Sequence, residues 1–168
     1  MSKKIPLYGL LVAVGSAIYV LENFVPFPVP IPGARWGFSN MIIVYALPDT
    51  PLSWLLALAF GKAIIGGLLS GRFLSPTFIM GSSGAIVATF SMFLTFKFLK
   101  KAGLAFHSVL GALLNNIVQV IIGTQIVSSW AILGYLPYME ILGVFSGVAN
   151  AVVAGIVLKR VKNEVRLR

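Results

Sequence analysis

Residues 5 to 24 read IPLYGLLVAVGSAIYVLENF, an apolar run in which Glu22 is the only charged residue. As an α-helix, which rises about 1.5 Å per residue, this run would be about 30 Å long, the thickness of the hydrocarbon layer of a membrane. Pro26, two residues after the end of this run, stops the helix. The stretch therefore predicts a membrane-spanning helix near the start of the chain.

The composition extends this interpretation to the whole chain. Of its 168 residues, 58% are apolar and 10% are charged, and the mean hydropathy is +0.97. A soluble domain has about 25% charged residues, so we predict a single integral membrane domain over 1–168 that has the lipid bilayer as a partner. The net charge of +9 does not indicate a nucleic-acid partner, because the basic residues cluster at the ends of apolar spans. The absence of cysteine excludes disulfides and thiolate metal ligands.

The pattern of apolar runs predicts an all-α membrane protein, a bundle of six transmembrane helices. The second run has only 12 residues, about 18 Å of helix, which is too short to cross a membrane alone. This helix must therefore begin below the surface, and its start draws Arg35 into the bundle. The expected helices cover residues 5–24, 36–47, 52–70, 76–99, 104–127 and 137–161.

The distribution of lysine and arginine predicts the orientation of these helices. With six spans, both termini and the loops near Asp49 and Lys100 share one side of the membrane, and that side has ten basic residues. The other side has Arg35 and Arg72, with Lys62 in mid-span. We therefore expect cytoplasmic termini and a location in the cell membrane. The ten basic residues are Lys3, Lys4, Lys97, Lys100, Lys101, Lys159, Arg160, Lys162, Arg166 and Arg168.

Polar residues at membrane depth gather in the outer half of this predicted bundle, where they would form a pocket that opens outwards and is closed inwards. Ionisable groups at this depth normally face a bundle interior or a watery cavity. Three cations against the acids Glu22 and Glu140 favour an anionic or zwitterionic small-molecule substrate. The candidate substrate-binding residues are Arg35, Asn40, Lys62, Arg72, Asn115, Asn116, Gln119 and Glu140.

Four of these candidates have an alternative interpretation, and one of them, Glu140, either contacts the ligand or serves as a counter-ion. Lys62 either contacts the substrate or forms an internal ion pair with Glu22 or Glu140. Arg72 either lines the pocket or extends towards lipid headgroups at the end of its helix. Asn115 and Gln119, four residues apart, share one helical face, whereas Asn116 is turned by about 100° and could instead bond to another helix.

The stretch FVPFPVPIPGAR, residues 24 to 35, alternates proline with apolar residues. Residues before proline favour an extended backbone, so the stretch predicts a stiff strand. We expect it to cover the mouth of the pocket as an external lid over 25–35; the alternative is a plain connector packed on the outer surface. The lid residues are Pro26, Pro28, Pro30, Pro32 and Gly33.

The first helix has a stripe of small residues, Gly9, Ala13 and Ala17, at four-residue spacing. Such a stripe lets a second helix approach closely, which makes it a candidate docking site for a partner; packing within the bundle is the alternative. A second small-residue stretch, GKAIIGGLLSG at residues 61 to 71, favours internal packing around Lys62.

These features together resemble the substrate-binding (S) subunit of an energy-coupling factor (ECF) transporter. More narrowly, the chain resembles the Gx transporter family, often labelled heptaprenyl diphosphate synthase component I. The motifs that carry the resemblance are FPVPIPGARWGFSN (27–40), GKAIIGGLLSG (61–71) and LLNNIVQVIIG (113–123). The chain departs from the family pattern in having Lys62 where arginine is expected and Arg35 where lysine is more usual.

The resemblance implies a mechanism. An S subunit binds a scarce micronutrient, such as a vitamin, at the outer face, and a membrane scaffold (T) subunit docks on the small-residue stripe of the first helix. Two ATPase subunits of this ABC importer then drive toppling of the S subunit, which delivers its cargo inside. This chain has no G-x-x-x-x-G-K-[ST] motif and therefore cannot be the ATPase.

Residue types argue against catalysis by the chain itself. Prenyl diphosphate synthases hold Mg²⁺ through clustered carboxylates, whereas this chain has one aspartate, Asp49, and three glutamates without paired spacing. We therefore predict a protein that is not an enzyme and needs no cofactor or metal. An accessory membrane subunit of polyprenyl (heptaprenyl) diphosphate synthesis and a stand-alone transporter or channel are the alternative functions.

Overall fold

The computed structural model describes residues 5–26, 28 and 35–166, and this part of the chain is helical, with no strand. Short 3-10 turns flank the second helix on both sides and precede the sixth. The α-helices are α1 (Ile5–Glu22), α2 (Met41–Ala46), α3 (Leu52–Leu69), α4 (Pro76–Phe98), α5 (Leu104–Val127) and α6 (Leu136–Arg166).

Five helical segments are long and apolar enough to cross a membrane: α1, α3, α4, α5 and the segment Trp130–Val161, which includes most of α6. The protein is therefore a multi-pass membrane protein. With six residues, about 9 Å, α2 is too short to cross alone, as its sequence predicts.

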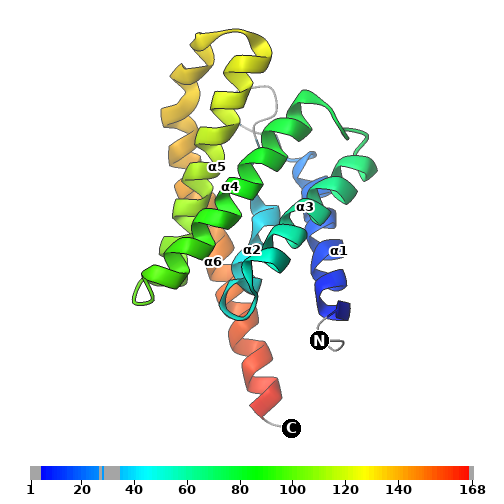
Figure 1. Ribbon diagram of the computed structural model, residues 1–168, viewed down its shortest axis with the longest axis vertical. Helices are drawn as coiled ribbons and strands as arrows, with labels where there is room; N and C mark the ends of the chain where they lie inside the picture. Colours follow the sequence, from blue (N-terminus) through cyan, green and yellow to red (C-terminus); the bar gives the residue numbers. More distant parts are fainter. Residues whose placement is uncertain (1–4, 27, 29–34, 167–168) are drawn as a thin grey trace.

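The long helices run up and down, and both termini lie at the same end of the molecule, together with the turn between α4 and α5 (Figure 1). Helices α4, α5 and α6 pack side by side in this order, and α1 packs against α3, which in turn contacts α4. Helix α2 lies in the middle, against α6 and α1, and its Ile42, Ile43 and Val44 are at most 3% exposed.

Two predicted helix ends differ from the structure by more than two residues. The second helix begins at Met41 rather than at residue 36, because Gly37 adopts a left-handed backbone (φ 77°) that a helix cannot contain. The sixth helix continues to Arg166, beyond the predicted end at residue 161, since lysine, arginine and glutamate favour helix although they are not apolar. Hydropathy marks the end of the apolar span and not the end of the helix.

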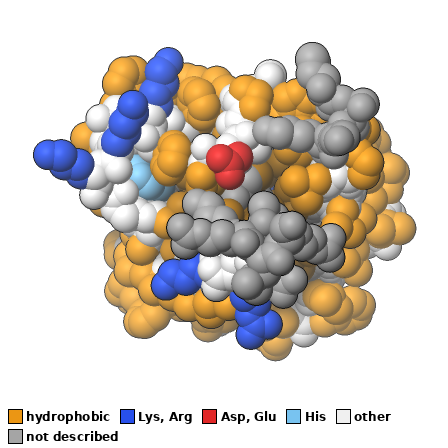
Figure 2. All heavy atoms as spheres, turned by 90° about the horizontal axis from the view of Figure 1, so that it is seen from below, with side chains coloured by type: hydrophobic (Ala, Val, Ile, Leu, Met, Phe, Trp, Pro, Cys, Tyr) orange, Lys and Arg blue, Asp and Glu red, His pale blue; other side chains and the backbone are white. Residues whose placement is uncertain are grey.

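Basic side chains lie at the end of the molecule that carries the termini, which Figure 2 shows from below. Lys97, Lys100 and Lys101, around the α4–α5 turn, are exposed, as are Lys159 and Arg160 near the end of α6. The sides of the bundle expose many large apolar residues, such as Leu21 and Phe145, as a surface in contact with lipid would.

Candidate functional site

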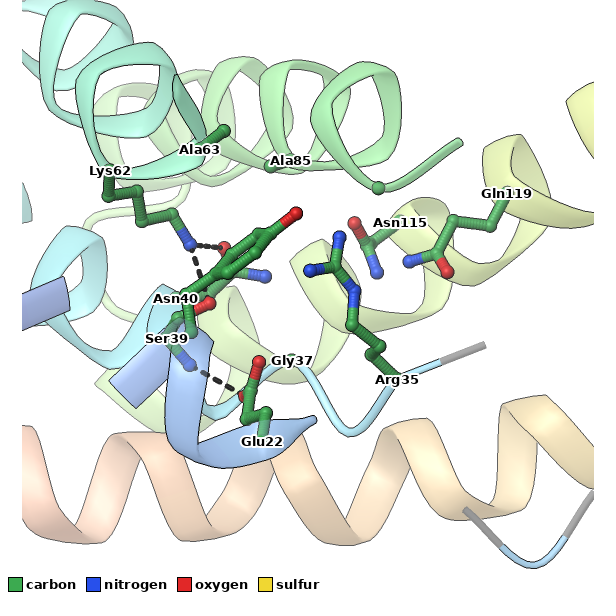
Figure 3. Close-up of a pocket in the computed structure, with 12 residues that line it drawn as sticks. Glu22, Arg35, Gly37, Ser39, Asn40, Lys62, Ala63, Ala85, Asn115 and Gln119 are labelled. Carbon is green, nitrogen blue, oxygen red and sulfur yellow. Dashed lines mark hydrogen bonds between the residues drawn. The ribbon is translucent and has the colours of Figure 1, made fainter. Parts of the chain in front are cut away.

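A small polar pocket lies inside the bundle, at the point where the end of α1 and the segment that leads into α2 meet α3, α4 and α5 (Figure 3). Its cavity has a volume of about 20 Å³, on the order of one water molecule. The lining residues are Tyr19, Glu22, Arg35, Gly37, Ser39, Asn40, Lys62, Ala63, Gly81, Ala85, Asn115 and Gln119.

Lys62 and Glu22 are the most deeply buried charges of the pocket, 2% and 5% exposed. Lys62 Nζ donates hydrogen bonds to Ser39 Oγ (3.0 Å) and to Asn40 Oδ1 (2.6 Å). The backbone N–H of Ser39 donates to Glu22 Oε1 at 2.9 Å. Ser39 thus joins the cation of α3 to the acid of α1, so that the two charges compensate each other through one residue (Figure 3).

Arg35 enters the pocket from the segment before α2. Its guanidinium carbon lies over the ring of Tyr19, 4.0 Å from the ring centre, as in a cation–π contact. Nη2 abuts the backbone of Gly81, where a Cβ atom would collide with it. Tyr19 is seated in turn against Gly66, where a Cβ atom would lie 2.6 Å from the Tyr19 ring. Glycines on α3 and α4 therefore make the room for this stack.

The wall of the pocket on α5 consists of Asn115 and Gln119, which are 4% and 3% exposed. Their spacing of four residues puts them on one face of the helix, as predicted. Gly84 lets α4 approach this face, because a Cβ atom there would lie 2.6 Å from Asn115 Oδ1. Gln119 Oε1 is buried and has no hydrogen-bond partner among the described residues.

The segment that carries Arg35 is fixed by α6. Asn150 Nδ2 donates to the carbonyl oxygen of Gly37 at 3.0 Å, although the two residues lie 113 positions apart. Asn150 is 2% exposed. It therefore anchors the left-handed turn at Gly37, which directs Ser39 and Asn40 towards Lys62.

Comparison with known proteins identifies the family. The model of the heptaprenyl diphosphate synthase component I family matches residues 11–157. The chain belongs to this family. The label heptaprenyl diphosphate synthase component I, which the sequence motifs predicted, is thereby confirmed. No curated protein and no solved structure matches the chain significantly.

In this member of the component I family, five of the eight predicted site residues line one pocket: Arg35, Asn40, Lys62, Asn115 and Gln119. Lys62 donates hydrogen bonds to the neutral side chains of Ser39 and Asn40. The backbone N–H of Ser39 in turn donates to Glu22. Lys62 thus lines the pocket and is joined to Glu22 through Ser39, and its contact with a substrate stays a prediction.

The other three predicted residues do not line this pocket. Asn116 Nδ2 donates to the carbonyl oxygen of Met139 at 2.7 Å and so joins α5 to α6, the alternative that its position on the helix indicated. Arg72 is exposed, and its Nη1 donates to Asn23 Oδ1 at 2.9 Å, which ties the end of α3 to the end of α1. Glu140 lies on the first turns of α6 and is not one of the lining residues.

Sequence reasoning missed six lining residues: Tyr19, Gly37, Ser39, Ala63, Gly81 and Ala85. Tyr19 and Gly81 look like ordinary constituents of apolar helices, and only their packing around Arg35 gives them a role. Ser39 had a detectable signal, because it directly precedes Asn40 at the start of a helix too short to cross the membrane.

Two further sets of predicted residues are those of the lid and those of the small-residue stripe on α1. Of the lid residues, Pro30, Pro32 and Gly33 lie outside the described residues, and Pro26 and Pro28 are exposed. On α1, the stripe Gly9, Ala13 and Ala17 is exposed in full, and a Cβ atom on Gly9 would meet nothing within 4 Å. Gly15 and Ser16 are instead the small residues that face the bundle.

Proposed function

We propose that this chain is the substrate-capture subunit of an ECF-type importer, which binds a small micronutrient for ATP-driven uptake and performs no catalysis itself. The observation that carries this proposal is the buried polar pocket. Arg35, Lys62 and Glu22 converge with two amides inside an otherwise apolar bundle. Charged groups are costly to bury in a membrane protein and mark substrate sites when they converge.

Binding in this pocket requires its lining to separate. The cavity of about 20 Å³ is smaller than an organic micronutrient such as a vitamin. Arg35 fills much of the space between Tyr19 and Gly81, and it stands on a segment between helices rather than within one. Arg35 is therefore the lining residue that moves to admit the substrate.

The proposal includes an orientation in the cell membrane. Lysine and arginine accumulate on the cytoplasmic side of membrane proteins. The exposed basic residues at the end that carries both termini support cytoplasmic termini (Figure 2). The pocket lies at the opposite end of α1, beside Lys62 and Ala63 just past the middle of α3, and would then receive its substrate from outside.

The proposed partners are a T subunit and two ATPase subunits. The exposed stripe Gly9, Ala13 and Ala17 supports docking of the T subunit on α1, because the bundle itself leaves this small-residue face uncovered.

Native mass spectrometry of the chain, purified alone in mild detergent, tests the capture role. A bound micronutrient of defined mass is the expected result, and Asn115→Ala should release it. A bound lipid-length polyprenyl compound would contradict the importer and favour an accessory subunit of polyprenyl diphosphate synthesis, as the family name suggests.

The docking step needs a separate test, in cells that express the chain with T and ATPase subunits. Ala13→Leu should abolish both co-purification of the T subunit and uptake of the identified micronutrient, since leucine would hold the helices apart. Ala105→Leu, at an exposed position on α5, is the matched control and should change neither. Uptake that survives Ala13→Leu without a T subunit would indicate a stand-alone transporter.

A further inference from the structure

The two cations of the pocket differ in how far their charges are already satisfied. Lys62 has oxygen acceptors at 2.6 and 3.0 Å, and Glu22 compensates its charge through Ser39. Arg35 makes no hydrogen bond to any described residue, and its contacts are the Tyr19 ring and the backbone of Gly81. A guanidinium has five N–H donors, so Arg35 is the cation of the pocket that can still donate to a ligand.

The net charge of the lining residues also favours a ligand with a negative charge. Arg35 and Lys62 are positive and Glu22 is negative, which leaves one positive charge in excess. A single negative charge on a ligand would neutralise the pocket. A diphosphate would leave an excess of negative charge beside the buried Glu22, and a cation would add to the positive charge, and both arrangements are costly away from water.

Gln119 supplies a second, independent observation. Its side chain is 3% exposed, and Oε1 has no partner in the described part of the chain. Figure 3 shows its amide near the guanidinium of Arg35 and the side chain of Asn115. A buried carbonyl oxygen without a partner calls for a donor, and a ligand with an N–H or O–H group can provide one.

We propose that Arg35 binds the carboxylate of a monoanionic ligand, and that Gln119 accepts a hydrogen bond from an N–H or O–H group next to that carboxylate. The planar fork of a guanidinium matches the two oxygens of a carboxylate, and hydrogen bonds between charged groups are stronger than neutral ones. Glu22, Ser39 and Lys62 shape the pocket without contacting the carboxylate. This inference rests on the proposed function, because it names the substrate class of the same pocket.

Thermal unfolding of the full chain in mild detergent, with small probes added, tests the inference. Lactate has a hydroxyl group next to its carboxylate, propionate lacks this hydroxyl, and inorganic diphosphate and choline carry the other charges. Lactate should raise the unfolding temperature most and propionate less, and diphosphate and choline should not raise it. Stabilisation by diphosphate or choline alone, or by none of the probes, would overturn the proposal.

Variants assign the two contacts. Arg35→Gln should weaken lactate and propionate binding roughly 10- to 100-fold, as expected for the loss of a charged hydrogen bond. Gln119→Leu should remove only the preference for lactate over propionate, a factor of about five. Arg72→Gln, which removes an exposed cation outside the pocket, is the matched control and should bind both probes normally. Equal losses in Arg35→Gln and Arg72→Gln would show a general charge effect and contradict the proposal.

Failure of this inference and failure of the proposed function give different results. If the chain co-purifies with a micronutrient that lacks a carboxylate, or that Arg35→Gln retains, the inference is wrong and the importer stands. If the carboxylate probes bind but Ala13→Leu leaves uptake intact, the proposed role as an ECF importer subunit is wrong. The inference that Arg35 binds a carboxylate then stands.

Discussion

Ser39 is the residue through which the two most deeply buried charges of the pocket meet. Its N–H donates to Glu22, and its hydroxyl group accepts from Lys62. Removing one member of a buried charge pair leaves the other uncompensated, which costs far more than removing both. Glu22 and Lys62 should therefore behave as one unit in unfolding experiments.

We predict that Lys62→Met and Glu22→Gln each lower the free energy of unfolding by about 3–5 kcal/mol, because each leaves a buried partner behind. The double variant should lose clearly less than the sum of the two, as residues in one hydrogen-bonded network do. Denaturant titration in detergent micelles measures all three values.

Lys97→Met, which removes an exposed cation at the other end of the molecule, is the control and should change the free energy of unfolding by less than about 0.5 kcal/mol. Strictly additive losses in the double variant would show that Glu22 and Lys62 are independent.

At the scale of the helices, α5 uses adjacent asparagines for different purposes. Asn115 faces the pocket, and Asn116 bonds to the carbonyl oxygen of Met139 on α6. The difference follows from the turn of about 100° per residue in a helix. One helix can thus contribute to a binding site and be attached to its neighbour at the same depth.

We predict that Asn116→Ala lowers the free energy of unfolding by about 1–3 kcal/mol, because it removes a buried hydrogen bond between α5 and α6 and leaves a gap between the two helices. Its ligand binding should stay intact, whereas Asn115→Ala should lose the ligand with a smaller effect on stability. Thermal unfolding and native mass spectrometry of both variants make the comparison. Loss of ligand in Asn116→Ala and its retention in Asn115→Ala would reverse the assignment.

The helices and half of the pocket could be predicted from the sequence because membrane burial leaves a strong signal. Hydropathy predicted the positions of the long helices. The predicted depth of the polar residues in the membrane placed Arg35, Lys62 and Asn115 in one pocket, where the structure has them. What the sequence could not show depends on packing between helices. No local pattern indicates that Gly81 makes room for a guanidinium or that Tyr19 lies beneath it.

At the scale of the whole molecule, the pocket and the exposed lysines lie towards opposite ends of the bundle. The pocket lies at the end of α1 and beside the first half of α4, whereas Lys97, Lys100 and Lys101 surround the turn between α4 and α5. An importer subunit needs this polarity, because its pocket must face the side from which the substrate arrives. The orientation of the chain therefore decides whether capture from outside is possible.

Single cysteines report this orientation without background, because the chain has no cysteine of its own. Gly103, in the α4–α5 turn, and Gly134, in the turn before α6, lie at the two ends of α5. Both are exposed, and a Cβ atom on either would meet nothing within 4 Å, so Gly103→Cys and Gly134→Cys form a matched pair that leaves every charge in place. A membrane-impermeant maleimide should label Gly134→Cys in intact cells and Gly103→Cys only after permeabilisation. The opposite labelling pattern would show that the pocket faces the cytoplasm, where it could not capture a nutrient from outside.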